Sequence, residues 1–127
     1  MTTPATPSAL IARVVADHEA DLVALRRDLH AHPELSWAEH RTTDVVAGHL
    51  EAIGWRLQRL RPAGLVAELG TGERTVGLRA DLDALPVQEV SEDPWRSTLP
   101  GVAHACGHDV HTSALVGAAH ALARVHA

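Results

Sequence analysis

The sequence predicts an α/β fold, in which helices flank a sheet of short strands. Before Gly54 the apolar residues recur at three- and four-residue steps, which is the period of one helical face. After Gly54 they fall into short runs separated by turns that contain proline or glycine, which is typical of strands. From Asp109 onward the helical pattern returns. Helices on both sides of a group of strands indicate helical layers packed on a sheet.

Two helices are predicted in the first part of the chain. An apolar stripe runs along residues 11–29, and Pro33 ends this helix because the residue before a proline is disfavoured in the α conformation. Ser36 and Glu39 have the spacing of a capping box, which predicts the start of a second helix. Gly54 follows that helix at the position where glycine is common.

Three strands are predicted over residues 55–60, 65–69 and 74–81. The linkers between them are short, so each strand is expected to pair antiparallel with the next. Residues 83–105 are rich in proline and polar side chains, and we predict a long loop there. A loop of this length in a compact domain is usually functional or disordered.

The apolar character of the last predicted helix indicates how much of a domain this sequence covers. Residues 114–123 are apolar nearly all round, so a helix there needs cover on several sides. Three strands and three helices are too few to supply that cover. We therefore expect residues 1–127 to be the N-terminal portion of one larger domain.

Composition excludes several classes of protein. With 127 residues, 46% of them hydrophobic and 21% charged, the chain is long enough for one globular domain and is not of the disordered class. A net charge of −5 without a basic run gives no reason to expect a nucleic-acid partner. No leader pattern and no long apolar window is present, so neither secretion nor a membrane span is predicted. A single cysteine cannot form an internal disulfide, and we predict a cytoplasmic protein.

Two carboxylates, Asp81 and Asp83, lie at the end of the third predicted strand. Ligand sites in open α/β sheets lie off the carboxyl ends of the strands, so these acids are candidate site residues. Taken alone, however, an Asp-x-Asp pair is more often two solvated loop acids.

The run HACGHDVH, residues 104–111, places a thiol, three imidazoles and a carboxylate at the start of the last helix. The positive end of a helix favours the thiolate, which is the form that binds metal. Gly107 allows Cys106 and His108 to point the same way. One alternative is an inert cysteine beside loop histidines, but such a density of titratable groups next to an apolar helix is costly without a partner. Another is a nucleophilic Cys106 with His104 or His32 as base, and that hypothesis leaves the strand-end acids unexplained.

Three runs together carry a family resemblance: RRDLHAHPEL at 26–35, RADLDALP at 79–86 and HACGHDVH at 104–111. In this order and spacing they resemble the M20 metallopeptidase family. They are most similar to its amidohydrolase branch, which includes hippurate hydrolase and the auxin–amino acid conjugate hydrolases. The likeness covers Leu22 to Ala127.

The resemblance implies an α/β/α zinc-peptidase-like catalytic domain with a mixed sheet, interrupted in the complete protein by a smaller domain that often forms a homodimer. Cys106 and His108 would bind part of a pair of divalent ions, Zn or Mn. Asp81 stands where other branches have the His of His-x-Asp, whereas Asp83 keeps the Asp. We assign Asp83 to the catalytic site, where it would orient a metal ligand. Cys106 and Asp81 argue against the dipeptidase and succinyl-diaminopimelate desuccinylase branches, and the resemblance gives Glu34 no role beyond shaping a loop.

The activity implied is hydrolysis of the amide bond of N-acyl amino acids, which are small-molecule substrates. The family's general base is a glutamate in a Glu-Glu pair that follows the apolar helix. No acidic residue follows Asp109 here, so we expect residues 1–127 to be incomplete and inactive by themselves. The alternative is a short metal-binding or partner-dependent protein without catalysis of its own.

Overall fold

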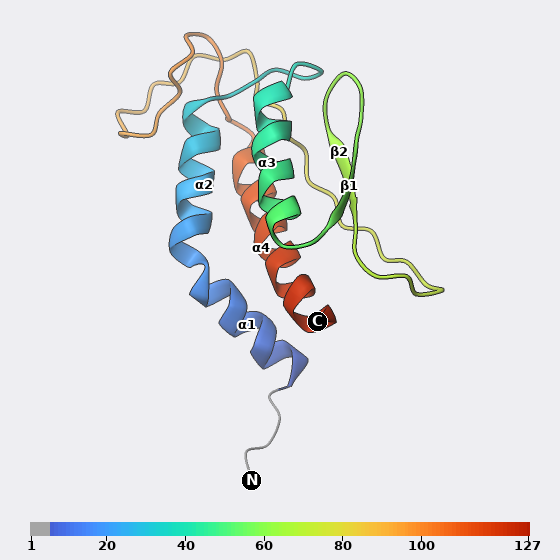
Figure 1. Ribbon diagram of the computed structural model, residues 1–127. Helices are drawn as coiled ribbons and strands as arrows, with labels where there is room; N and C mark the ends of the chain where they lie inside the picture. Colours follow the sequence, from blue (N-terminus) through green and yellow to red (C-terminus); the bar gives the residue numbers. More distant parts are fainter. Residues whose placement is uncertain (1–5) are drawn as a thin grey trace.

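The computed structural model describes residues 6–127 and confirms the α/β class (Figure 1). Helix α4 packs against α1, α2 and α3, while the two strands form a hairpin beside α3. In chain order the elements are α1 (Pro7–Asp17), α2 (Glu19–Ala31), α3 (His40–Ala52), β1 (Arg56–Arg59), β2 (Leu65–Glu68) and α4 (His108–His126).

The first predicted helix is interrupted at one residue. His18 separates α1 from α2 and has φ −105° and ψ 5°. Its backbone N–H and its ring Nδ1 both bond the carbonyl of Val14, at 3.2 and 2.8 Å. Its ring also lies against that of His120 in α4, with 4.2 Å between the ring centroids. The single helix predicted over residues 11–29 was therefore wrong at His18, where a side chain competes for the carbonyl that continues a helix.

The start of α3 also differs from the prediction. Helix α2 ends at Ala31, as the proline predicted, but Glu34 rather than Ser36 caps the next helix. The two carboxylate oxygens of Glu34 accept from the backbone N–H groups of Thr42 and Arg41, at 2.6 and 2.9 Å. The capping box was wrong because α3 begins only at His40, too far along the chain for Ser36 to reach its free N–H groups.

The hairpin confirms the first predicted pair of strands. β1 and β2 run antiparallel, with Arg56 opposite Glu68 and Arg59 opposite Leu65. Their half-buried side chains pack on the core, in line with the alternation expected of a strand with one covered face.

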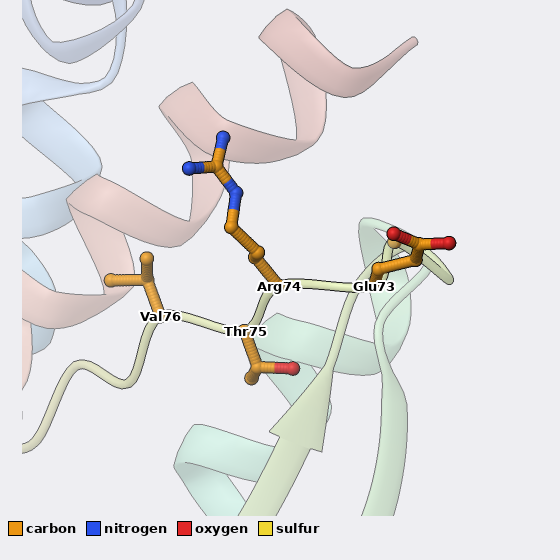
Figure 2. A pocket seen from close by; sticks show the side chains of 5 residues that line it. Glu73, Arg74, Thr75 and Val76 are labelled. Atoms are coloured by element: carbon orange, nitrogen blue, oxygen red, sulfur yellow. The ribbon is translucent and has the colours of Figure 1, made fainter.

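The third predicted strand was wrong. Residues 74–81 are extended, and Figure 2 shows the side chains of Arg74 and Val76 on one side of the backbone and that of Thr75 on the other. Within residues 6–127, however, no backbone hydrogen bond joins this segment to a neighbour. A strand is defined by such pairing, and here the alternation of side chains is present without it. Val76 and Leu78 are 86% and 57% exposed as a result.

The core is built from small aliphatic side chains. Where α2 meets α4, a Cβ atom on Gly117 would lie only 2.9 Å from Leu22 Cδ1, so the glycine leaves room for the tip of the Leu22 side chain. Some apolar side chains of α4 remain exposed, among them Leu122 and Val125. The buried cluster consists of Leu25, Leu29, Val46, Leu50, Val116 and Ala119.

The long loop between residues 83 and 105 is confirmed, and it folds over the C-terminal end of α2 (Figure 1). The backbone N–H and hydroxyl of Thr98 both donate to the carbonyl of Ala31, at 2.9 and 2.7 Å. The guanidinium of Arg27 lies 3.9 Å from the centre of the Trp95 ring. None of the helices within residues 6–127 has the length and apolar character needed to cross a membrane.

Replacing Glu34 tests the cap of α3. Glu34→Ala removes both acceptors from the helix N-terminus, and we expect it to lower the free energy of unfolding by about 1–2 kcal/mol. Glu39→Ala is the control, because it removes a carboxylate from the same end of α3 that accepts no hydrogen bond. Chemical denaturation of both variants measures the difference, and equal losses would show that charge near the helix end, not the two hydrogen bonds, stabilises α3.

Candidate metal and catalytic site

The strand-end acids and His108 converge although 25 residues separate Asp83 from His108. His108 is the first residue of α4, and its Nδ1 lies 2.9 Å from Asp83 Oδ1 and 2.9 Å from the carbonyl oxygen of Asp83. Its other ring nitrogen, Nε2, lies 3.9 Å from Asp81 Oδ2. With its proton on Nδ1, His108 donates to Asp83 and keeps a lone pair on Nε2, the form in which histidine binds metal.

Asp83 is held as an anion. The hydroxyl of Ser36 donates to Asp83 Oδ2 at 2.7 Å and is the main cause of the lowered pKa of this carboxyl. Partial burial opposes the shift, and the hydrogen bond with His108 adds to it. A carboxylate that remains ionised at neutral pH is a strong acceptor for the Nδ1–H of His108.

Asp81 is positioned by both its backbone and its side chain. Thr112, one turn into α4, donates its hydroxyl to the carbonyl of Asp81 at 3.0 Å. Arg79 pairs with Asp81 Oδ1 at 2.6 Å, and this hydrogen bond raises the pKa of the exposed guanidinium. Oδ2 is therefore the oxygen of Asp81 that faces His108.

The members of the HACGHDVH run do not share one environment. Cys106 is a free, exposed cysteine, whereas His104 is only 5% exposed. Neither ring nitrogen of His104 has a hydrogen-bond partner among residues 6–127, and burial lowers its pKa, which keeps the ring neutral. The ring of His111 lies 5.8 Å from that of His108, measured between centroids. Burial therefore separates His104 from the exposed Cys106.

The donors fit a divalent metal in kind. Cys106 offers a thiolate, His108 a ring nitrogen fixed by hydrogen bonding, and Asp81 a carboxylate oxygen. Within the described part of the chain, however, no three His, Cys, Asp or Glu side chains lie close enough together to hold an ion. A metal bound at His108 would need donors in addition to these.

The hollow drawn in Figure 2 is a different place. It has a volume of about 760 Å³ and is lined by residues 72–76, all of which are exposed. None of its lining residues is one of the candidate site residues. This open surface next to an unpaired strand-like segment gives no support for a binding site.

The sequence analysis missed two residues that shape the site. Ser36, interpreted there as a helix cap, instead fixes Asp83. His30, noted only as part of the first family run, forms a buried contact with Asp109, which follows His108. Both contacts join residues more than 40 positions apart, so a sequence pattern that spans only a few residues cannot predict them.

Comparison with known proteins agrees with this geometry. Residues 77–127 match the model of peptidase family M20/M25/M40. The chain is 45% identical over 112 residues to the N-acyl-L-amino acid amidohydrolase of Geobacillus stearothermophilus, a match that covers 86% of this chain and 30% of that protein. It is also 54% identical over 110 residues to the putative glutamate–cysteine ligase 2-3 of Rhodococcus jostii, covering 84% of this chain. Only 14% of that second protein is matched, so most of it lies outside the likeness.

A solved structure shares the fold. The YXEP protein of Bacillus subtilis, described as a dinuclear metal binding peptidase from the M20 family, superimposes with a TM-score of 0.80 at 37% identity. That match covers 87% of this chain and 32% of that chain. This chain thus spans about a third or less of the proteins compared with it. The family model, the relatives and the shared fold together show that the chain belongs to the M20 peptidase family.

Proposed function

We propose that the protein containing these residues is a metal-dependent amidohydrolase that cleaves the amide bond of N-acyl amino acids. The observation that carries the proposal is the Asp83–His108 contact, which leaves His108 Nε2 free beside Asp81. An imidazole whose outer nitrogen is held by a carboxylate is a recurrent arrangement at metal sites. The amidohydrolase named among the relatives supports the choice of substrate class.

Cys106 and His108 are the proposed metal ligands. A thiolate ligand favours Zn, while the neighbouring carboxylate oxygens also tolerate Mn, in a site that would hold two ions. When bound, such ions polarise the amide carbonyl and activate water for attack. Gly107, with φ 84°, lies between the two ligands and permits the sharp turn that presents both of them.

The chain's own residues orient the ligands. Asp83 accepts from Nδ1 of His108, so the ring cannot rotate away without breaking two hydrogen bonds. The hydroxyl of Ser36 holds Asp83 in place and lowers its pKa, and Thr112 fixes the backbone of Asp81. In this proposal Asp83 serves the catalytic site by holding His108, and it does not itself contact a metal.

Further parts of the proposal concern the rest of the protein. Residues 1–127 would form the N-terminal portion of one catalytic domain, with the general base, the remaining ligands and an inserted dimerisation domain elsewhere in the protein. The lack of any three-ligand group among residues 6–127 is consistent with a site completed by other residues. A free thiol as ligand suits a reducing compartment, and we propose a cytoplasmic location.

Metal content tests the two ligands. We expect the folded chain to bind Zn or Mn, with an affinity that falls at least about tenfold in Cys106→Ser and in His108→Asn, because each change removes one donor. His126→Asn, at the other end of α4, is the control and should bind as wild type does. Equal stoichiometry in wild type and Cys106→Ser by elemental analysis would remove Cys106 from the site.

The hydroxyl of Ser36 should control the acidity of Asp83. A carboxyl whose pKa is lowered by folding stabilises the native state above the pKa of the unfolded chain, near 3.8, and loses that contribution as the pH falls. In Ser36→Ala the pKa of Asp83 should rise toward its ordinary value, so less stability is lost on acidification. Carboxyl titration by NMR checks this, with Ser36→Thr as a variant that keeps the hydroxyl. An unchanged pKa in Ser36→Ala would leave the lowered value without its main cause.

The 127-residue chain alone should not hydrolyse hippurate or N-acetyl amino acids in the presence of added Zn or Mn. The two proposed ligands do not make a complete metal site. No carboxylate follows Asp109 in this sequence, so the expected general base is also absent from it. Product release measured with and without metal checks this expectation. Metal-dependent turnover that disappears in Cys106→Ala would contradict the claim that the site is completed elsewhere.

A further inference from the structure

A buried charged contact ties α2 to the first turn of α4. Asp109, the second residue of α4, is only 1% exposed. Its Oδ2 atom lies 2.7 Å from Nδ1 of His30 and 2.9 Å from Nε of Arg26. Both partners come from the last two turns of α2. His30 is hydrogen-bonded to this oxygen, whereas the guanidinium of Arg26 is paired with it by charge.

The second nitrogen of His30 reaches the long loop. His30 Nε2 lies 2.9 Å from Glu89 Oε1, and the other oxygen of Glu89 accepts from the backbone N–H of Ser97 at 2.6 Å. Burial acts to raise the pKa of Glu89, but the hydrogen bonds from Ser97 and His30 outweigh it and hold that pKa below its usual value. The two ring nitrogens of His30 therefore contact two carboxylates, one on α4 and one in the long loop.

The position of this contact in the chain gives it a consequence for the site. Asp109 directly follows His108, and the turn that begins at Gly107 is closed by hydrogen bonds from the N–H groups of Val110 and His111 to the carbonyl of Gly107, both 3.1 Å. Cys106, on the other side of Gly107, is exposed, and its side chain makes no hydrogen bond within residues 6–127.

We infer that His30 and Arg26 are positioning residues, which hold the first turn of α4 through Asp109 and so fix the direction in which His108 and Cys106 are presented. The part of this inference that concerns metal affinity rests on the proposed function. A contact that only stabilised the fold would act on every element alike. A positioning contact acts first on the turn that carries the ligands.

Local amide exchange separates these two roles without any metal. In Asp109→Asn and His30→Gln we expect the amide protons of Val110 and His111 to exchange at least about tenfold faster, while those of the β1–β2 hairpin change little. Asp28→Asn is the matched control: it breaks an ion pair between α2 and Arg41, with 2.8 Å between the charged atoms, that does not involve α4. Equal acceleration throughout the chain, or none at the turn, would overturn the inference.

Arg26 gives a second test should Asp109→Asn fail to fold, because the Arg26 side chain is partly exposed. Arg26→Met should accelerate exchange at Val110 and His111, and Arg26→Lys, which keeps a positive charge toward Asp109, should restore much of the protection. If Lys and Met behave alike, Arg26 acts through packing and not through its charge, which would overturn its place in the inference.

Zn binding by the folded chain then connects the turn to the site. We expect a loss of about tenfold in Zn affinity for Asp109→Asn and no loss for Asp28→Asn. Faster exchange at the turn in a chain whose wild type binds no Zn would support the positioning contact and refute the proposed metal site. Unchanged Zn affinity in an Asp109→Asn variant that does show faster exchange would refute positioning of the ligands and leave the proposed function intact.

Discussion

The close packing of α2 on α4 is the constraint on which the rest of the structure depends. Gly117 leaves room for the tip of the Leu22 side chain, which lies where a Cβ atom would be too close. At the other end of the contact, Asp109 of α4 lies between His30 and the guanidinium of Arg26. An apolar contact and a charged contact thus fix both the separation of the helices and their position along each other. The first turn of α4, and with it His108, takes its place from this docking.

The same docking explains how distant segments meet at His108. The segment that ends in Asp81 and Asp83 runs along the N-terminal part of α4, where Thr112 bonds its backbone. Ser36, in the connection between α2 and α3, completes the arrangement by donating to Asp83. The loop of residues 83–105 connects the acids Asp81 and Asp83 to the start of α4. It is held on α2 by the hydrogen bond from Thr98 to the carbonyl of Ala31. Asp81 is thus held by α4 through Thr112, and Asp83 by the α2–α3 connection through Ser36.

Sequence patterns predicted the features that depend on neighbouring residues. The proline after α2, the glycine after α3, the turn between β1 and β2 and the polar composition of the long loop all act over a few positions, so they could be recognised without a structure. The break at His18 and the cap by Glu34 were missed because a side chain there competes with, or replaces, the expected local partner. Residues 74–81 have strand-like alternation, but pairing depends on a neighbour that a linear pattern does not provide.

For the site, the family resemblance implied that Asp83 orients a metal ligand, and in the structure Asp83 lies against His108. The motif did not predict burial. In the turn that precedes α4, His104 lies inside and Cys106 outside although only Ala105 separates them. A dense cluster of donor types in sequence is thus divided by the fold into ligand candidates and packing residues. His108 has one ring nitrogen held by Asp83 and the other 3.9 Å from Asp81, whereas neither ring nitrogen of His104 has a hydrogen-bond partner among residues 6–127.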